Sequence, residues 1–161
     1  MKVKEVMMGT PYYCQLETNL GSATELMWVG NCGFLPVMNA NGKLVGVVTD
    51  RDICIALGTR NRPAGELSVA DVMSNRLFAC SPDDDVHFAL ETMKEGGVRR
   101  LPVTSEKGIL VGVISMDDLL VRAESAGIGK RPELSTEEVV KAYRAIDKRR
   151  VPQIVLARGA A

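Results

Sequence analysis

The sequence contains the same unit twice, and this duplication limits the folds that the chain can adopt. Residues 44–53 (LVGVVTDRDI) recur as residues 110–119 (LVGVISMDDL). Aligning residues 3–57 with residues 69–123, at an offset of 66, gives about 17 identities in 55 positions, where unrelated sequences give about three. A repeat of this length is one supersecondary unit that packs against its copy to bury a shared core. We therefore predict an α+β fold built from two similar halves.

Hydrophobic spacing predicts the main elements of each half. Apolar residues at helical spacing predict a helix in both copies, through Leu20, Ala23 and Met27 and through Val86, Ala89 and Met93. Further along the first copy, two apolar runs at residues 34–38 and 44–48 flank an Asn-Gly pair, which predicts a hairpin with a type I′ turn. A second helix is predicted to begin at Thr49 or Asp50 and to end near Gly58.

The breaks between these patterns divide the chain into four parts. We assign residues 1–58 to the first repeat, 59–67 to a linker, 68–124 to the second repeat and 125–161 to a C-terminal extension. In the extension, Ser135 and Glu138 have the spacing of a capping box, which predicts a helix to about Arg149. Residues 151–156 are predicted to form a short strand.

Composition removes several classes of function. Twenty basic and twenty acidic residues cancel, so the broad positive field of a nucleic-acid-binding protein is not expected. We find neither the apolar core of a signal peptide nor a run of about 20 apolar residues that could span a membrane. The four cysteines lack metal-ligand spacing and fall in the predicted core pattern, which favours buried thiols and a reducing cytoplasm.

Each copy ends a strand and begins a helix with a hydroxyl residue followed three positions later by aspartate. The pairs are Thr49 with Asp52 and Ser115 with Asp118. A phosphate can bind at such a helix N-terminus, with the hydroxyl as a further donor, and the carboxylate can accept both hydrogen bonds of a ribose diol. The same spacing also matches a capping box, which needs no ligand. Because duplication copies either arrangement, the residues alone leave both interpretations open.

Gly46 and Gly112 lie in the strands that lead to these motifs. A glycine leaves the space of a side chain empty, so that another group can approach the backbone closely. We therefore expect both glycines to leave room for a ligand.

The repeated pattern resembles a tandem pair of CBS domains, the Bateman module. It begins V-x-(D/E)-V-M, passes through a helix to L-P-V, and ends after a turn with L-V-G-V-(V/I)-(T/S)-x-x-D-(I/L). The resemblance covers residues 1–124 in order. It implies two β-α-β-β-α repeats, packed sheet to sheet about a pseudo-twofold axis, to which this chain adds a C-terminal helical extension. It also implies a homodimer.

The family binds adenine nucleotides such as AMP, ATP or NAD in the clefts between its repeats. Carried over by position, the resemblance implies that Thr49 and Ser115 contact the phosphate and that Asp52 and Asp118 hold the ribose.

A basic pair before L-P in the second repeat, Arg99 and Arg100, matches further phosphate contacts of the family. The first repeat has Gly33 and Phe34 at these positions, which leaves Arg51 as its candidate cation. The base pockets that the resemblance implies are lined by Tyr12, Tyr13, Cys14, Leu35, Pro36, Phe78, Ala79, Cys80, Leu101 and Pro102.

We therefore predict a regulatory module, not an enzyme, in which a bound adenine nucleotide changes the conformation or the contact with a regulated protein. A ligand can switch a protein only when it binds two conformations with different free energies. The sequence shows no nucleophile with a histidine, no acid and base pair and no metal-ligand cluster, so no catalytic residue and no metal is predicted. The alternative is a ligand-free dimerisation or scaffold module, in which both motifs only cap helices.

Overall fold

The computed structural model describes residues 1–124 and 132–150, and it has two similar halves. The first half contains β1 (Cys14–Gln15), α1 (Leu20–Val29), β2 (Phe34–Met38), β3 (Leu44–Thr49) and α2 (Asp50–Arg60). The second half contains α3 (Val86–Gly96), β4 (Arg100–Thr104), β5 (Leu110–Ser115) and α4 (Met116–Arg122), and α5 (Thr136–Arg150) follows it. Single 3-10 turns lie at η1 (Val3–Glu5), η2 (Ala64–Glu66) and η3 (Val69–Asp71).

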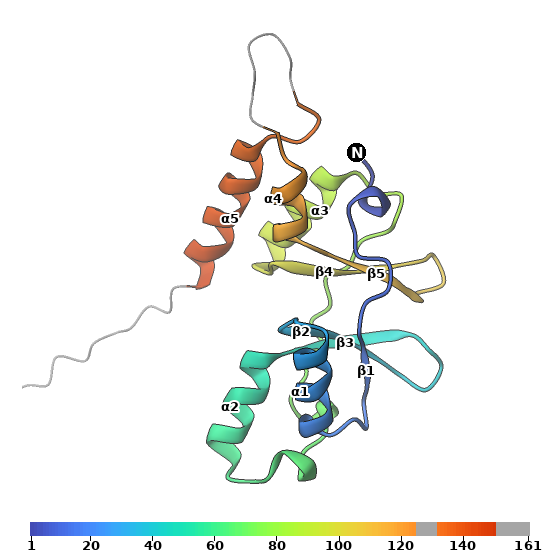
Figure 1. The fold of residues 1–161 in the computed structure, drawn as a ribbon, viewed down its shortest axis with the longest axis vertical. Coiled ribbons are helices and arrows are strands. Elements are labelled where there is room, and N and C mark those ends of the chain that lie inside the picture. The colour runs from blue at the N-terminus through green and yellow to red at the C-terminus, as the bar shows by residue number, and fades with distance from the viewer. Residues whose placement is uncertain (125–131, 151–161) are drawn as a thin grey trace, which may run out of the picture.

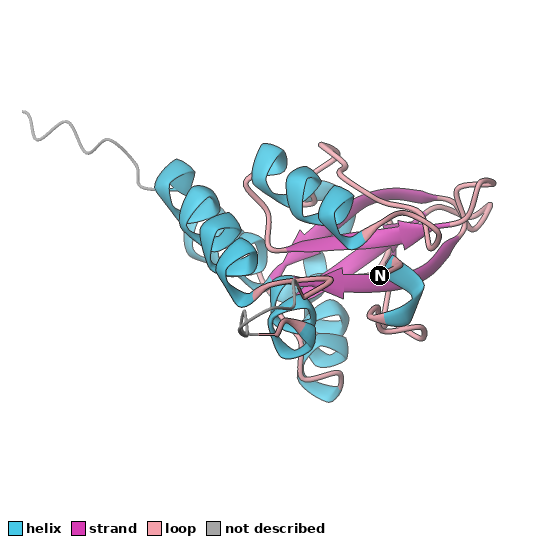
Figure 2. Ribbon diagram, turned by 90° about the horizontal axis from the view of Figure 1, so that it is seen from above, coloured by secondary structure: helices cyan, strands magenta, loops and turns pink. Residues whose placement is uncertain are grey.

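The strands of the two halves meet in the middle of the molecule, and the helices lie outside them (Figures 1 and 2). In the first half β1 pairs parallel to β2, and β2 pairs antiparallel to β3. In the second half β4 and β5 form the matching antiparallel pair, and Cys80 makes one parallel bridge to Val103 in place of a first strand. The predicted α+β architecture is therefore confirmed.

Each half has its own hydrophobic core, and the predicted helical spacing identifies the core face of its first helix. Leu20, Ala23 and Met27 of α1 are all buried in the first core. The corresponding residues of α3 are buried in the second core, which also contains Leu90. Aliphatic and methionine side chains fill both cores.

The segment that begins each sequence repeat packs on the opposite half of the structure. Val3 is fully buried in the second core, and its N–H donates to the carbonyl of Asp84 at 2.9 Å. Val69 is fully buried in the first core, and its N–H donates to the carbonyl of Thr18 at 2.8 Å. The two halves thus exchange their first segments.

Gly46 and Gly112 accommodate these exchanged segments, so the prediction that they leave room for a ligand is wrong. A Cβ atom on Gly112 would lie 2.6 Å from Met7 Sδ and 2.9 Å from the carbonyl oxygen of Met8. A Cβ atom on Gly46 would lie 2.7 Å from the carbonyl oxygen of Ser74. In each case, backbone from the other sequence repeat fills the space beside the strand.

Replacing Gly112 with alanine is expected to lower the free energy of unfolding by about 1–3 kcal/mol, because the new methyl group collides with the Met8 carbonyl. Gly58 is a matched control, since a Cβ there meets nothing within 4 Å and the residue lies in α2. Gly58→Ala should stabilise the protein by about 0.5–1 kcal/mol through helix propensity. Urea unfolding measures both changes, and an unchanged midpoint for Gly112→Ala would show that the segment at Met8 does not pack there.

The hairpin turn and one helix end differ from the prediction. In the turn at Asn39–Gly42, only Gly42 has a positive φ, at 69°, and the Gly42 N–H donates to the Asn39 carbonyl. A type I′ turn needs positive φ at both central residues, so that turn type is wrong. Helix α2 continues past Gly58 to Arg60 because Asn61 supplies the left-handed cap.

The predicted C-terminal helix is present as α5. Its capping box is confirmed, since the Ser135 hydroxyl donates to Glu138 Oε2 at 2.6 Å and accepts from the Glu138 N–H at 3.3 Å. The predicted strand at 151–156 lies outside the described residues. Within residues 1–124 and 132–150, none of the helices has both the length and the apolar composition that crossing a membrane requires.

Candidate functional site

Both hydroxyl and aspartate motifs form complete capping boxes at a junction between strand and helix. The Thr49 hydroxyl donates to Asp52 Oδ2 at 2.7 Å and accepts from the Asp52 N–H at 3.2 Å. The Ser115 hydroxyl donates to Asp118 Oδ2 at 2.6 Å and accepts from the Asp118 N–H at 3.1 Å. The backbone N–H of each hydroxyl residue also donates to the same Oδ2. Each motif therefore has a structural role without any ligand.

The same bonds leave one carboxylate oxygen of each motif unused. Among the residues that the structure describes, no donor bonds Oδ1 of Asp52 or Asp118. Both aspartates are half-buried. A ribose hydroxyl can therefore donate to Oδ1 while Oδ2 continues to cap the helix. The Ser115 hydroxyl has one proton to donate. If it donates a hydrogen bond to a phosphate, its hydrogen bond to Asp118 Oδ2 is lost.

Positive charge stands beside the second motif. Arg100 pairs directly with Ser115 across β4 and β5, which places their Cβ atoms about 4.5–5.5 Å apart on one face of the sheet. Within the described part of the chain, the Arg100 guanidinium makes no ion pair. In the first half the cross-strand partner of Thr49 is Phe34, which is 8% exposed. The exposed Arg51 is the candidate cation of that half, and it makes no ion pair to a described residue.

Arg99, the other predicted phosphate contact, is held by α5. Its Nη2 lies 2.6 Å from Asp147 Oδ1, and its guanidinium lies 5.5 Å from the centre of the Tyr143 ring. The hydrogen bond that Arg99 donates to Asp147 raises the pKa of Arg99. The Tyr143 hydroxyl donates to Asp117 Oδ1 at 2.7 Å, so α5 contacts a residue within the second motif as well as Arg99. The sequence did not predict this contact.

The predicted base-pocket residues fall into two groups. Leu35 and Leu101 are fully buried in the two cores, so their assignment to an open base pocket is wrong. Their place in the middle of a paired strand turns these side chains toward the helices. The buried group also contains Cys14, Pro36, Cys80 and Pro102.

The aromatic members and Ala79 are more accessible. Tyr12 and Phe78 pack on the C-terminal ends of α1 and α3, where Cβ atoms on Gly30 and Gly96 would lie 2.7 Å and 2.9 Å from their rings. Ala79 is half-buried. The Arg76 guanidinium lies 5.1 Å from the centre of the Phe78 ring, which adds another cation to the second half.

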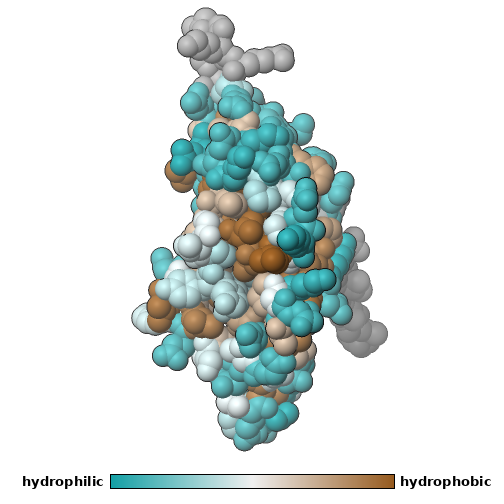
Figure 3. Space-filling view, turned by 90° about the vertical axis from the view of Figure 1, so that its right-hand side faces the viewer, coloured by the Kyte–Doolittle hydropathy of each residue, from teal (hydrophilic) through white to brown (hydrophobic). Residues whose placement is uncertain are grey.

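Tyr13 lines a cavity between the two hairpins. The cavity has a volume of about 520 Å³, and its walls include Met38 of the first hairpin and Ile109 and Leu110 of the second. Figure 3 shows the side of the molecule that lies on the right in Figure 1. Hydrophobic side chains gather near the middle of that side, with hydrophilic side chains around them. Of the predicted site residues, Tyr13 alone is in this lining.

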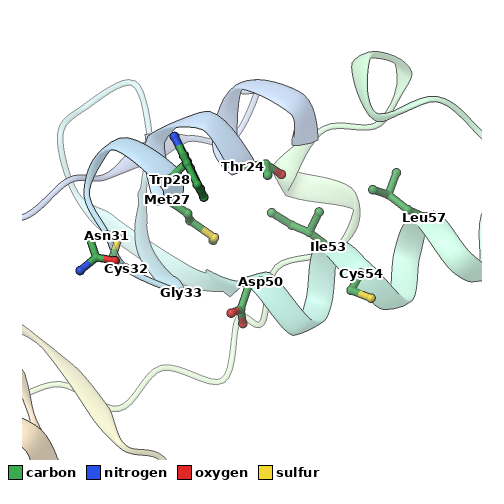
Figure 4. Close-up of a pocket in the computed structure, with 10 residues that line it drawn as sticks. All are labelled: Thr24, Met27, Trp28, Asn31, Cys32, Gly33, Asp50, Ile53, Cys54 and Leu57. Carbon is green, nitrogen blue, oxygen red and sulfur yellow. The ribbon is translucent and has the colours of Figure 1, made fainter.

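A second groove, between α1 and α2, was not predicted (Figure 4). Its volume is about 640 Å³, and none of the predicted nucleotide contacts lines it. The lining combines a buried floor with exposed walls and consists of Thr24, Met27, Trp28, Asn31, Cys32, Gly33, Asp50, Ile53, Cys54 and Leu57. No pattern within either sequence repeat distinguishes this groove from an ordinary contact between two helices.

The cysteines differ in exposure, although the sequence placed all four in the core. Cys14 and Cys80 are buried, whereas Cys32 is half-buried and Cys54 is exposed. The prediction is therefore wrong for Cys54, because its position on α2 faces the open groove. Within the described ranges, no three potential metal ligands among His, Cys, Asp and Glu lie together.

Exposure and burial predict a sharp difference in thiol reactivity. Burial raises the pKa of Cys14 to about 11 and that of Cys80 to about 12. Both thiols are therefore protonated at pH 8, and the thiolate is the reactive form. We expect a maleimide to label Cys54 quickly and to label Cys14 and Cys80 only after unfolding. Mass spectrometry of peptides measures this order, and equal labelling of Cys14 and Cys54 in the native protein would contradict it.

Comparison with known proteins identifies the family. The model of the CBS domain family matches residues 3–59 and again residues 69–124. The CBS domain-containing protein YhcV of Bacillus subtilis is 33% identical over 128 residues, which cover 78% of this chain and 89% of YhcV.

Longer proteins match over a part of their length. The match covers 57% of protein MK0525 of Methanopyrus kandleri, at 28% identity and 73% of this chain. It covers only 22% of inosine-5'-monophosphate dehydrogenase of Methanocaldococcus jannaschii, at 30% identity and 74% of this chain. Some enzymes thus contain this module as one part of a larger chain.

Solved structures show the same fold. The CBS domain pair of protein MJ0100, in complex with 5'-methylthioadenosine and S-adenosyl-L-methionine, is similar with a TM-score of 0.67 and 22% identity. The similarity covers 74% of this chain and 92% of that one. Together with the two matches to the family model, it shows that this chain belongs to the CBS domain family and contains a tandem CBS pair.

Proposed function

We propose that this protein is a regulatory module that binds a phosphorylated adenine nucleotide beside Ser115, Asp118 and Arg100. The observation that carries the proposal is the position of Arg100. It stands directly across the sheet from Ser115 and has no ion pair among the described residues. A partly buried cation without a counter-ion, next to a helix N-terminus, favours an anionic ligand.

The chemistry of the ligand follows from the groups that face it. Asp118 Oδ1 accepts from the ribose diol, and the Arg100 guanidinium pairs with a phosphate. The complex of MJ0100 with 5'-methylthioadenosine and S-adenosyl-L-methionine supports an adenosine-containing ligand. Neither of those molecules has a phosphate, and the sulfonium of the second is positive. Arg100 therefore favours AMP, ATP or NAD over these two.

The first repeat is the weaker candidate. Gly33 and Phe34 replace the two arginines of the second repeat. Arg51 is exposed, so its attraction for a phosphate is weakened by water and salt. We expect one nucleotide per chain at low concentration, at the second repeat.

Binding can be coupled to a change in conformation through Arg99. A phosphate close to Arg100 also attracts Arg99, whose present partner is Asp147 on α5. If Arg99 turns to the phosphate, α5 loses that ion pair and the cation that faces Tyr143. The nucleotide then binds more tightly to the form in which α5 is released, and this difference in affinity makes the ligand a switch.

The alternative is a ligand-free module for dimerisation or scaffolding. The complete capping boxes at Thr49 and Ser115 favour it, since both motifs have a structural role as they stand. The homodimer that the resemblance implies stays a prediction, which size-exclusion chromatography with light scattering tests.

A thermal-shift titration with AMP, ADP, ATP, NAD and S-adenosyl-L-methionine tests the proposal. A ligand that binds only the folded state raises the unfolding midpoint, and a concentration of 100 times Kd contributes about 2.7 kcal/mol. We expect at least one phosphorylated nucleotide to raise the midpoint and S-adenosyl-L-methionine to have a smaller effect. If no ligand shifts the midpoint at millimolar concentration, the scaffold alternative is favoured.

A further inference from the structure

The cavity that Tyr13 lines lies between the turns of the two hairpins, and we call it the hairpin cavity. The turns lie next to each other on the right in Figure 1, where Lys43 makes an isolated bridge to Ile109. The first repeat supplies most of the lining, and the second repeat supplies Ile109 and Leu110. The two repeats therefore build this cavity together.

The hairpin cavity is separate from the proposed nucleotide site. Leu110, at the start of β5, lines the cavity, whereas Ser115 ends that strand. Five steps of extended chain, at about 3.3 Å each, place these two residues roughly 17 Å apart. Neither Asp52 nor Asp118 is in the lining. The cavity is thus a second place where one small molecule can contact both repeats.

The lining combines apolar surface with neutral polar side chains. Among its described residues there is no Asp, Glu, Lys, Arg or His. Met38 is buried, whereas Tyr13 and Ile109 are 53% and 48% exposed. A thioether, an aromatic ring and an aliphatic side chain together suit a flat aromatic ligand. A charged ligand would lose water in this cavity without gaining a counter-ion.

Two amide side chains can give such a ligand hydrogen bonds. The Gln15 amide has a donor and an acceptor, and its side chain makes no hydrogen bond to the residues that the structure describes. Asn39 Oδ1 accepts from the N–H groups of Asn41 and Lys43, both at 3.0 Å, so its NH2 group is left as a donor. A carboxamide or a lactam, which has a carbonyl beside an N–H, complements these groups.

The corresponding positions of the other repeat have a different chemistry. Three lining positions that are uncharged in the cavity are charged at the offset of 66, and the pairs are Thr10 with Arg76, Ala40 with Glu106 and Ile109 with Lys43. Tyr13 and Met38 correspond to the smaller Ala79 and Thr104. The repeat therefore folds with charged residues at these positions. The uncharged, apolar lining is a property of this cavity and not a requirement of the fold.

We propose that the hairpin cavity binds a small, uncharged, planar aromatic molecule that carries a carboxamide or a lactam. The ring packs against Tyr13, Met38 and Ile109, and the amide group exchanges hydrogen bonds with Gln15. The volume of about 520 Å³ lies in the range of sites that bury most of such a molecule. Because both repeats line the cavity, the bound molecule stabilises the contact between the two hairpins. The proposal does not depend on nucleotide binding.

A matched pair of probes tests the proposal on the full-length protein. Quinoline-3-carboxamide is planar and neutral, and quinoline-3-carboxylate has the same rings with a negative charge. NMR titration of isotope-labelled protein reports on the side-chain amides of Gln15 and Asn39 and on the Met38 methyl group. Ile109→Lys brings the lysine of the other repeat into the lining. Val121→Lys adds the same charge on α4, where Val121 is 84% exposed, and is the control.

We expect the carboxamide to bind with a Kd of about 1 mM or tighter, as is usual for a ligand of its size, and to shift the signals of Gln15, Asn39 and Met38. The carboxylate should bind at least about tenfold more weakly. Ile109→Lys should remove or reverse this preference, because its ammonium group supplies the missing counter-ion. Val121→Lys should leave the preference unchanged.

Equal binding of the two probes to the unchanged protein would overturn the proposal. It would also be overturned if Gln15 and Met38 showed no shift at a carboxamide concentration of roughly 10 mM, ten times the expected Kd. The same loss of preference in Val121→Lys and Ile109→Lys would show a general effect of charge and contradict a local site. Shifts confined to the surroundings of Ser115 and Asp118 would place the probe at the nucleotide site instead.

Discussion

Replacing Ile146 with alanine is expected to lower the free energy of unfolding by about 2–5 kcal/mol, the range measured for large aliphatic residues in cores. Ile146 is fully buried in the second core, where α5 contacts α3 and α4. Its removal leaves a cavity between helices that are already close-packed, so the lost contacts are not replaced. The effect is large for a residue in the extension because α5 completes the core.

Val140→Ala is the matched control on the same helix. Val140 is 40% exposed, so its truncation should change the free energy of unfolding by less than about 1 kcal/mol. Urea unfolding followed by far-UV circular dichroism measures both variants. If Ile146→Ala is as mild as Val140→Ala, α5 is not docked in solution, and the coupling through Arg99 would be excluded with it.

Replacing Asp118 with asparagine is expected to weaken nucleotide binding by roughly 100-fold. The ribose diol loses hydrogen bonds to a charged acceptor, each worth about 1.5–3 kcal/mol, and 1.4 kcal/mol corresponds to a factor of ten. The asparagine side chain keeps an oxygen that can cap α4, so the variant should fold with nearly unchanged stability. Calorimetric titration measures the affinity, and thermal unfolding without ligand checks the fold.

Asp52→Asn changes the same group in the first repeat and serves as the control. Because that repeat has Phe34 in place of Arg100, we expect less than a threefold loss of affinity for the first nucleotide bound. Equal losses in the two variants would show that both clefts bind with similar strength. A loss of affinity in Asp52→Asn alone would show that the nucleotide binds at the first repeat.

The periodicity of the sequence was sufficient to predict the main helices and strands of the fold. Leu20, Ala23 and Met27 identified the buried face of α1, and Ser135 with Glu138 identified the start of α5. These features are local, since spacing and capping depend on residues within one or two turns.

Contacts between distant segments could not be predicted in this way. An alignment of the two repeats is the same whether Val3 packs on its own half or on the other, so the exchange of segments left no signal. The role of Gly112 was misread for the same reason, because the neighbour that needs the space is Met8 from the other half. Leu35 was assigned to a pocket by position in the motif, whereas the direction of its side chain depends on the pairing of β2.

The motif itself is ambiguous for a chemical reason. Capping and nucleotide binding use the same atoms, namely a hydroxyl, a carboxylate and the N–H groups of a first turn. In the structure Asp118 Oδ2 caps and Oδ1 is open to a ligand, so the two roles are compatible. The neighbouring Arg100 distinguishes the second motif from the first. In the sequence, only the resemblance to the family indicated that Arg100 could contact a ligand.

The central claim is that Arg100 holds the phosphate of a nucleotide whose ribose is held by Asp118. Calorimetric titration of AMP and of adenosine, with the unchanged protein and with Arg100→Gln, tests it most directly. We expect AMP to bind at least about tenfold more tightly than adenosine, since one charge-assisted hydrogen bond contributes about 1.5–3 kcal/mol, and we expect Arg100→Gln to remove this difference. Equal affinities of AMP and adenosine for the unchanged protein, or a difference that persists in Arg100→Gln, would contradict the claim.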